Sequence, residues 1–480
     1  MTDLKDFIES EKSMVIAPAG YGKTHTIIDI LKCYQGSKKI LVLTHTHAGI
    51  ASIREKAKKE HIDSALYSLD TISSFALFLT NSFVSHKERI PQPDDDNYFP
   101  CVIAIASNII KAKPVKDYLF YSYSHLIVDE YQDCTLQQHR FVMRLSEIMK
   151  THILGDPLQG IFDFNGDIVN FNSIRQNDGF NNSVQELDEP WRWKNKNEQL
   201  GRDLIAIRKE IIESDGLEDI SNYQSIIYYK SDDINDIYNP TTDVYKQFNK
   251  FMMQNKPDSL LIIVPEKYNV SHFVKRFQAQ FGIREINDFD DKWFYKKSKE
   301  IDSGINVSKC IFNLLSDLFP KTVITEWINN NTYKVKRKRN FEDNSKFYND
   351  LSNLYSSPNY GSLRWYKDII TLFRQWYFRQ CNLEKTYAII KAVDIAISKS
   401  TNVYEGMKKG RDITRRIGRK VFGRYVGTTL LTKGLEFETV IIINPNILKN
   451  EKHLYVALTR ATHNLIVIST SKHIKPNSNN

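Results

Sequence analysis

Seven short runs of β-branched and apolar residues recur along this chain, and they constrain its fold more than any other feature. They are nearly continuous in apolar character, which is typical of strands that a parallel sheet buries on both faces. Helical stretches separate many of them, so the sequence predicts an α/β fold with doubly wound parallel sheets. The runs are Met14–Ala17, Ile40–Thr44, His125–Asp129, Ile153–Gly155, Leu260–Val264, Val440–Asn444 and Leu465–Ser469.

Length and composition narrow the class of protein further. With 480 residues the chain exceeds a single hydrophobic core, so we expect two to four domains. No apolar run approaches the ~20 residues of a membrane-spanning helix, and residues 1–12 lack a signal-peptide core, so we expect a cytoplasmic protein. Five scattered cysteines suggest neither a zinc site nor disulfides. The net charge of +9 mildly favours a polyanionic partner.

The segment that follows the first run has the form of a phosphate-binding loop. It reads Ala17-Pro18-Ala19-Gly20-Tyr21-Gly22-Lys23-Thr24, and it opens a helix whose next residue is His25. Backbone N–H groups of such a loop surround phosphate oxygens, and the helix N-terminus adds positive potential. We expect Lys23 to reach the β- and γ-phosphates and Thr24 to ligate Mg²⁺. A plain strand–helix turn is the alternative, and it is less favoured in this context.

Two adjacent carboxylates end the third run. An apolar strand that leads into Asp129 and Glu130 is costly unless a metal ion or a proton transfer needs both groups. Asp129 is expected to hold Mg²⁺, and Glu130 is expected to polarise an attacking water. The alternative is a solvated acidic turn. The phosphate loop upstream makes that alternative improbable.

These segments belong to an ordered series that resembles the superfamily 1 helicases of the UvrD/PcrA/Rep type. Asp129-Glu130-Tyr131-Gln132-Asp133 is similar to the DExQD motif, and the phosphate loop is standard apart from Tyr21, where a small residue is usual. The series continues through Gly155–Phe164, Glu189–Arg192, Thr428–Glu436 and Tyr455–Ala461. The resemblance implies two RecA-like motor domains of the P-loop NTPase class that bind ATP and Mg²⁺ between them.

The resemblance also assigns roles to residues around the nucleotide. It implies that Gln159 senses the γ-phosphate, and that Arg192 and Arg460 reach it from the second motor domain. Guanidinium groups suit the charge of a transferring phosphoryl group. Glu436 is similar to the residue that contacts the nucleotide sugar, and Gly434 is counted with it. No glutamine precedes Gln35, so the glutamine that reads adenine in the family is missing and the preference for ATP stays open.

The segments expected to contact nucleic acid match less closely. His45 stands where the first strand-contacting motif has phenylalanine, Phe164 replaces a tryptophan that stacks on a base, and Leu430 replaces a histidine. Stacking contributes about 1–3 kcal/mol per base, so these changes could weaken the grip on a strand. An ordinary core position is the alternative for Phe164. The candidate contacts are Thr44, His45, His47, Ser74, Phe75, Phe162, Phe164, Thr428 and Lys433.

The domain organisation follows from the order of these motifs. We expect the first motor domain in residues 1–185 with a small insert near 76–120, the second in 186–285 and 406–472, a helical accessory insert in 286–405, and a disordered tail in 473–480. Two basic clusters lie near the accessory insert, and each either tracks phosphates or forms a solvated face. They are Lys334–Arg339 and the set Lys408, Arg411, Arg415 and Arg419.

The sequence favours an enzyme that hydrolyses ATP to translocate on single-stranded DNA, with 3′-to-5′ polarity implied by resemblance alone. RNA is not excluded as the track. The alternative is an ATP-gated sensor of DNA ends that activates a partner nuclease in antiviral defence, with little unwinding. The compact size and the Val128–Asp133 segment are similar to the small helicase-like subunit of Gabija anti-phage systems. A catalytically dead binding module is disfavoured, because Lys23, Asp129, Glu130, Gln159, Arg192 and Arg460 are all present.

Overall fold

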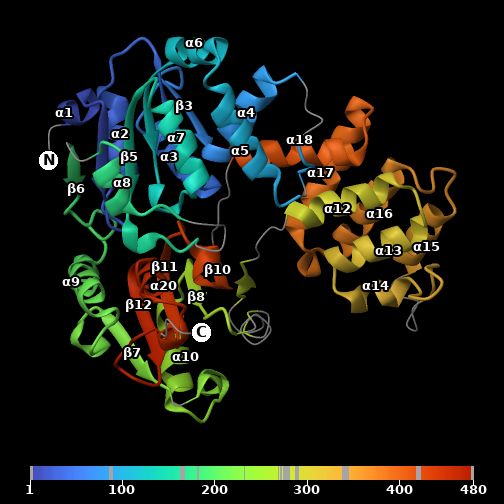
Figure 1. The fold of residues 1–480 in the computed structure, drawn as a ribbon. Helices are drawn as coiled ribbons and strands as arrows, with labels where there is room; N and C mark the ends of the chain where they lie inside the picture. Colours follow the sequence, from blue (N-terminus) through green and yellow to red (C-terminus); the bar gives the residue numbers. More distant parts are fainter. Residues whose placement is uncertain are drawn as a thin grey trace. The chain divides into compact units, whose positions relative to one another are not determined.

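The computed structural model describes residues 4–85, 90–93, 95–162, 168–180, 183–231, 233–268, 270, 273, 282–286, 291–337, 345–417 and 423–476. The chain divides into two compact units. The two-sheet body consists of Met1–Lys87, Pro100–Asp288 and Gly418–Asn480, and the helical unit consists of Glu88–Phe99 and Phe289–Ile417. Figure 1 shows the sheets and helices of both units. The expected α/β class with parallel sheets is confirmed.

The first lobe of the two-sheet body runs from α1 to β6 and holds a parallel sheet. Its strand order is β3-β2-β4-β5-β1-β6. Central strands are buried on both faces; Leu41 and Val42, neighbours on β2, are each 0% exposed. The strands are β1 (Lys12–Ile16), β2 (Lys39–Thr44), β3 (Tyr67–Thr71), β4 (Tyr123–Val128), β5 (Lys150–Gly155) and β6 (Val184–Glu186). The helices are α1 (Leu4–Glu9), α2 (Lys23–Cys33), α3 (His47–Lys59), α4 (Ile72–Phe83), α5 (Tyr98–Ile109), α6 (Lys113–Ser122), α7 (Leu136–Leu145) and α8 (Phe171–Asn177).

The second lobe repeats this plan with the chain that follows β6 and the chain that follows the helical unit. Its parallel strands have the order β7-β12-β11-β8-β10-β9, so the last two long strands pair with segments some 200 residues earlier. The strands are β7 (Ile226–Lys230), β8 (Leu260–Ile263), β9 (Arg284–Glu285), β10 (Arg424–Gly427), β11 (Phe437–Ile443) and β12 (Ala461–Ser469). The helices are α9 (Glu198–Ser214), α10 (Asp243–Asn255), α19 (Thr429–Thr432) and α20 (Glu451–Leu458).

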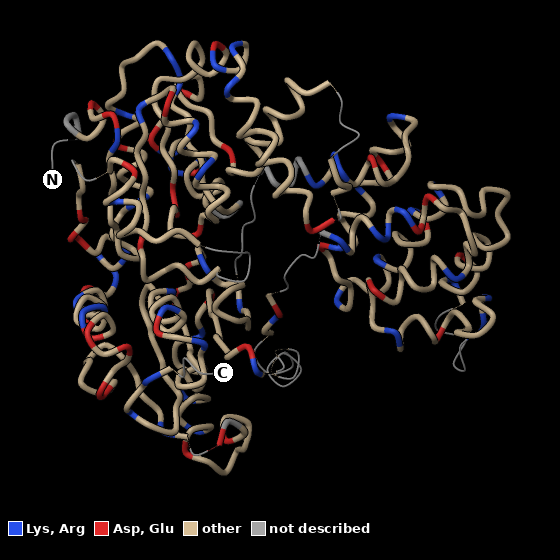
Figure 2. Tube along the Cα trace, viewed as in Figure 1, with Lys and Arg blue, Asp and Glu red and all other residues tan. Residues whose placement is uncertain are grey.

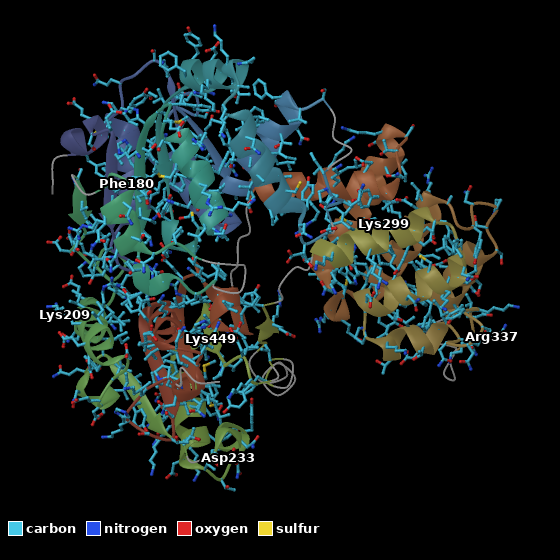
Figure 3. The ribbon with its side chains drawn as sticks, viewed as in Figure 1. Phe180, Lys209, Asp233, Lys299, Arg337 and Lys449 are labelled. Atoms are coloured by element: carbon cyan, nitrogen blue, oxygen red, sulfur yellow. The ribbon has the colours of Figure 1, made fainter. Side chains whose placement is uncertain are left out.

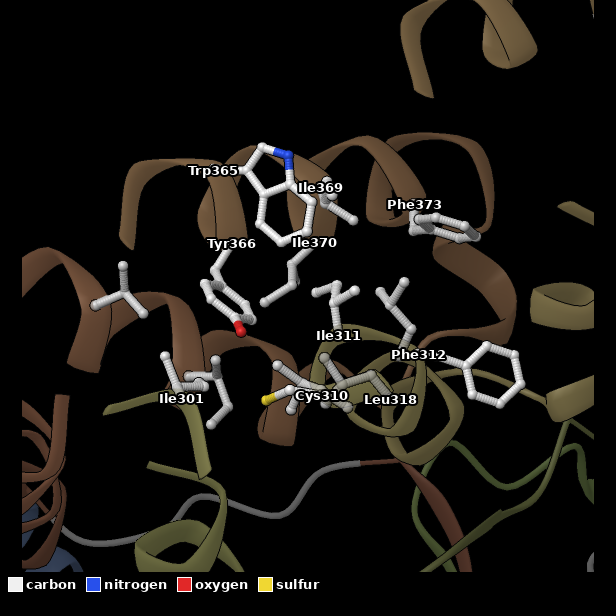
Figure 4. Packing of buried hydrophobic residues seen from close by; sticks show 14 of the residues in the cluster. Ile301, Cys310, Ile311, Phe312, Leu318, Trp365, Tyr366, Ile369, Ile370 and Phe373 are labelled. Atoms are coloured by element: carbon white, nitrogen blue, oxygen red, sulfur yellow. The ribbon is translucent and has the colours of Figure 1, made fainter. Parts of the chain in front are cut away.

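The helical unit has a hydrophobic core of its own. Trp365, Tyr366, Ile369 and Ile370 project from one face of α16, where a spacing of three and four residues brings them together (Figure 4). Lysines, arginines and acidic residues are interspersed along its elements in Figure 2. Its helices are α12 (Asp291–Asp302), α13 (Val307–Leu318), α14 (Lys321–Trp327), α15 (Ser345–Tyr355), α16 (Leu363–Trp376), α17 (Leu383–Lys399) and α18 (Val403–Ile417).

The boundaries of the units differ from the expected ones in two places. Helix α18 belongs to the helical unit, because Val403 and Met407 are buried in its core, whereas residues from 406 onward were assigned to the second motor domain. Ile474, in the expected disordered tail, is buried and exchanges two backbone hydrogen bonds with Leu217. Within the described residues, no helix is both long and apolar enough to cross a membrane.

Candidate functional site

The phosphate loop joins β1 to α2 at the carboxyl edge of the first sheet. Gly20 and Gly22 have φ values of +79° and +93°, a left-handed conformation that side chains with a Cβ rarely adopt. Space also excludes a side chain at Gly20, since an added Cβ would lie 2.9 Å from the Arg192 Cβ and from the Trp193 ring. The loop therefore curls tightly at the N-terminus of α2 and approaches the second lobe closely.

Two carboxylates follow β4 and face the loop. Asp129 is 3% exposed, and its Oδ1 accepts a hydrogen bond of 2.9 Å from the Glu130 backbone N–H. Glu130 has a φ of +54°, which is uncommon for a residue with a Cβ and places its side chain toward the loop. The Glu130 Oε2 accepts hydrogen bonds from Lys23 Nζ at 3.1 Å and from Gln132 Nε2 at 2.5 Å.

The electrostatics of Lys23, Asp129 and Glu130 favour a bound cation. Burial, together with the charge of Glu130, raises the pKa of Asp129 to about 7. Burial also opposes ionisation of Glu130, but Lys23 and Lys433 outweigh it and lower the pKa of Glu130. Burial would lower the pKa of Lys23, yet the two carboxylates raise it. The buried Asp129 and the half-buried Glu130 thus share one lysine, and this excess of oxygen ligands is the donor set that Mg²⁺ prefers.

Gln159 connects the two lobes at this edge. It is 4% exposed in a short turn after β5; its Nε2 donates to Asp156 Oδ2 at 2.9 Å. Its Oε1 accepts a hydrogen bond of 3.3 Å from Arg460 Nη2 of the second lobe. Arg460 is 1% exposed, and burial followed by the charge of Arg192 lowers its pKa to about 10. Arg192 donates to the Thr459 carbonyl and to Glu436 Oε1, the latter at 2.8 Å.

A cavity of about 300 Å³ collects these residues. Of the expected nucleotide-site residues, only Ala17 and Tyr21 do not line it: Ala17 is buried where β1 ends, and Tyr21 points elsewhere. The lining consists of Pro18, Ala19, Gly20, Gly22, Lys23, Thr24, His25, Thr46, Gly49, Ser52, Lys56, Asp129, Glu130, Gln159, Trp191, Arg192, Lys196, Gly434, Glu436 and Arg460. The glycine-rich loop, the lysine and the carboxylate pair fit a nucleoside triphosphate with a divalent cation.

Sequence reasoning missed six of the residues that line this cavity, namely Thr46, Gly49, Ser52, Lys56, Trp191 and Lys196. The Trp191 ring, 40% exposed, stacks on the His25 ring with centroids 6.4 Å apart and an interplanar angle of 28°. Its signal in the sequence is the aromatic residue that stands directly before Arg192. Lys56 of α3 also lines the cavity, and burial lowers its pKa. No local pattern marks it, because only folding brings α3 beside the loop.

The candidate nucleic-acid contacts are divided by the structure. Thr44, Phe75 and Lys433 are buried, at 0%, 3% and 8% exposure. In this arrangement their side chains are therefore not accessible to a nucleic-acid strand. The Lys433 ammonium instead donates to the Asp133 carboxylate and to the Gln159 carbonyl. The sequence predicts that Lys433 contacts a nucleic-acid strand from an exposed position. The structure differs, because both partners of its ammonium lie inside the junction between the two lobes.

Four other candidates remain partly accessible. His45 and Phe162 are half-buried and stack with centroids 6.0 Å apart, and Lys433 Nζ lies 4.7 Å from the Phe162 ring centroid. Ser74 and Thr428 are half-buried at the N-terminal ends of α4 and α19. Phe164 and the His47 side chain lie outside the described residues.

Three described side chains of the two basic clusters contact residues of the helical unit. Arg337 lies over the Tyr348 ring at 5.5 Å and is labelled in Figure 3. Arg411 lies over the Phe294 ring at 4.7 Å, and Lys408 is 3.7 Å from Glu405. The side chains of Arg415 and Arg419, and residues 338–339, lie outside the described part of the chain.

Comparison with protein families bears on both lobes. The profile of the AAA domain matches residues 3–165, from before the phosphate loop to just past Gln159. The profile of the UvrD-like helicase C-terminal domain matches residues 425–468, which hold Lys433, Glu436 and Arg460. No curated protein matches the chain. The first match indicates nucleotide binding and the second a DNA helicase or translocase, so together they support a UvrD-like helicase family of superfamily 1 for this chain.

Proposed function

We propose that the chain hydrolyses ATP with Mg²⁺ and uses the cycle to translocate along single-stranded DNA in the 3′-to-5′ direction. One observation carries the proposal. A single cavity combines Lys23, the carboxylate pair and Gln159 of the first lobe with Arg192 and Arg460 of the second. During phosphoryl transfer, negative charge is redistributed over the phosphoryl oxygens. Cationic side chains that reach these oxygens from the second lobe are the residues that this step requires.

Each side chain has a role that its environment supports. Thr24 and Asp129 would hold the Mg²⁺ ion, which neutralises phosphate charge when it is bound. Lys23 binds phosphate oxygens. Glu130 is ionised at neutral pH because its pKa is lowered, so its carboxylate can accept a proton from an attacking water. The amide of Gln159 orients that water or the terminal phosphate oxygens.

The Trp191–His25 pair supports recognition of the base by stacking. A base inserted between the two rings would need about 7 Å between their planes, so the rings, whose centroids lie 6.4 Å apart, would have to move apart. Because Trp191 is 40% exposed, a small displacement of its ring admits a base. Stacking does not depend on the hydrogen-bonding edge of the base. We therefore expect GTP to be accepted nearly as well as ATP.

The arginines link hydrolysis to movement. Arg192 and Arg460 reach the cavity from the second lobe, so a bound triphosphate favours closure of the lobes and hydrolysis removes that bias. Alternate closing and opening on a strand is the two-state change that directed movement needs.

A second candidate function is an ATP-gated sensor of DNA ends that activates a partner nuclease. The exposed aromatic side chains of the helical unit favour it: Trp376, Phe378 and Tyr387 are 41%, 53% and 52% exposed around the turn between α16 and α17. Aromatic residues of this kind are enriched in protein–protein interfaces. This function needs nucleotide-dependent closure but little unwinding.

Two variants test the proposed chemistry. Lys23→Ala should abolish hydrolysis by removing a phosphate contact, and Glu130→Gln should abolish it while nucleotide stays bound. Turnover is measured with and without single-stranded DNA, and binding with a fluorescent ATP analogue. Near-normal turnover in either variant would refute the site.

Strand displacement separates a plain helicase from a translocase that unwinds poorly and from the sensor. On a tailed duplex, with hydrolysis saturated by single-stranded DNA, we expect translocation with poor unwinding, since separation of each base pair costs roughly 1.4 kcal/mol in stacking. Rapid unwinding of long duplexes by the chain alone would favour the plain helicase and exclude the sensor.

A further inference from the structure

Tyr21 of the phosphate loop does not face the nucleotide cavity. Its side chain is 6% exposed and, with Ala19 at 2%, belongs to the hydrophobic cluster of the second lobe. Trp193, Leu200 and Tyr455 are members of the same cluster. Two residues of the loop that would hold the phosphates in the first lobe therefore belong to the core of the second lobe.

Backbone contacts hold the same segment. The Ala19 N–H donates a hydrogen bond of 3.2 Å to the Tyr455 hydroxyl, and Gly20 O accepts one of 2.9 Å from the Arg192 N–H. The ring of Trp193 is so close to Gly20 that no Cβ fits there. The two residues that precede Tyr21 thus each have a hydrogen-bond partner from the chain beyond the first sheet.

Arg208 of α9 extends this contact to Gln159. Its guanidinium lies 5.1 Å from the Tyr455 ring centroid and pairs with Asp156 Oδ1 at 2.9 Å. Asp156 is 0% exposed and also accepts a hydrogen bond from Gln159 Nε2 at 2.9 Å. Removal of Arg208 would leave a buried carboxylate without its cation, which favours a rearrangement of Asp156 and of the amide that it orients.

We propose that Tyr21, Arg208 and Tyr455 form an anchor through which the second lobe positions the phosphate loop and Gln159. They are positioning residues, since none of them lines the nucleotide cavity. Tyr21 and Tyr455 act on the loop and hence on nucleotide affinity. Arg208 acts through Asp156 on Gln159 and hence on turnover. The proposal therefore has two testable parts, an affinity arm and a turnover arm. The turnover arm, the effect of Arg208 on kcat, rests on the proposed hydrolysis of ATP. The affinity arm, the effect of Tyr21 and Tyr455 on nucleotide binding, requires only that nucleotide binds.

The affinity arm compares Tyr21→Ala with Tyr21→Phe in the full chain. A non-hydrolysable fluorescent ATP analogue with Mg²⁺ is the probe, at a temperature where both variants are folded by circular dichroism. Tyr21→Ala should weaken binding about tenfold, and Tyr21→Phe should stay within about twofold because it keeps the packing. Tyr455→Phe removes the hydroxyl that accepts from the Ala19 N–H and also hydrogen-bonds with Arg208, and it should weaken binding about threefold. A lower melting temperature of Tyr21→Ala with unchanged affinity would overturn the proposal.

The turnover arm compares Arg208→Met with Lys209→Met, its exposed neighbour on α9 that Figure 3 labels. Arg208→Met should lower kcat about tenfold with the affinity for the analogue within about twofold, and Lys209→Met should match the parent chain. Arg208→Lys, which restores a cation beside Asp156, should recover part of kcat. Equal effects of Arg208→Met and Lys209→Met would overturn this arm. A parent chain that binds the analogue without hydrolysing ATP would refute the proposed function, and Tyr21 would still decide the anchor through affinity.

Discussion

Arg460 illustrates at the scale of one residue how the second lobe enters the site. Its Nε donates to the carbonyl of Val456 in α20 at 2.9 Å, and its Nη2 reaches Gln159. The guanidinium is thus fixed by the helix that precedes it before any ligand binds, so little entropy would be lost on contact with phosphate. A preorganised cation of this kind contributes mainly to the transition state.

Arg460→Ala should therefore slow turnover far more than it weakens binding. The expected loss in kcat is on the order of 10³ or more, with nucleotide affinity changed by less than about fivefold. Steady-state hydrolysis and binding of a fluorescent analogue provide the two values. A variant that only raises KM would identify Arg460 as a binding residue.

Lys433 differs most from its expected role. Because its ammonium is buried between Asp133 and the Gln159 carbonyl, we expect it to couple the lobes and not to bind phosphates of a strand. Lys433→Met should reduce DNA-stimulated turnover more than basal turnover. The salt dependence of single-strand binding should keep its slope, whereas the loss of a phosphate contact would lower that slope by about one.

At the scale of elements, β5 carries a histidine inside the first sheet. His152 is 0% exposed, its Nδ1 lies 2.6 Å from Ser13 Oγ on β1, and its ring stacks on His125 of β4 at 5.5 Å. Burial, followed by the charges of His125 and Lys150, lowers the pKa of His152 to about 3. The sheet therefore accepts only the neutral imidazole.

This histidine should make the fold sensitive to acid. In the unfolded chain, His152 takes up a proton near its ordinary pKa of about 6.5, whereas in the folded chain it does so only near pH 3. The contribution of neutral His152 to the free energy of unfolding is therefore fully present above pH 6.5 and is lost as the pH falls below that value. The expected loss is about 1.4 kcal/mol per pH unit from this group. His152→Gln should reduce the difference in the free energy of unfolding between pH 7.5 and pH 5. An unchanged difference, measured by urea denaturation at both pH values, would contradict this.

The whole molecule combines a two-sheet body with a helical unit that has a separate core. None of the residues that line the nucleotide cavity comes from the helical unit. Units with separate cores commonly unfold in separate steps. Damage to the core of the helical unit should therefore leave the nucleotide site intact.

Ile370→Ala tests this separation. Ile370 of α16 is 0% exposed, so its truncation should destabilise the helical unit by about 2–5 kcal/mol and lower one thermal transition. Nucleotide affinity should stay within about twofold. Ile397→Ala on α17, where the parent side chain is 46% exposed, is the matched control and should shift neither quantity. Loss of nucleotide binding with Ile370→Ala would show that the two units fold as one.

The sequence by itself indicated the elements whose character is local. The central strands are apolar because helices bury both faces, and the phosphate loop is visible because Gly20 and Gly22 need a left-handed backbone. The edge strands β3 and β7 escaped prediction, since most of their residues are only half-buried and need no apolar run.

Only the tertiary structure decided which side chains meet across the two lobes. Tyr21 enters the core of the second lobe, Arg208 pairs with Asp156, and Lys433 turns inward, through contacts between residues separated by 52 to 436 positions. A local pattern reports backbone conformation and the sidedness of burial. It contains no information about which distant element will lie opposite, because that depends on how whole sheets and helices fill the space between them.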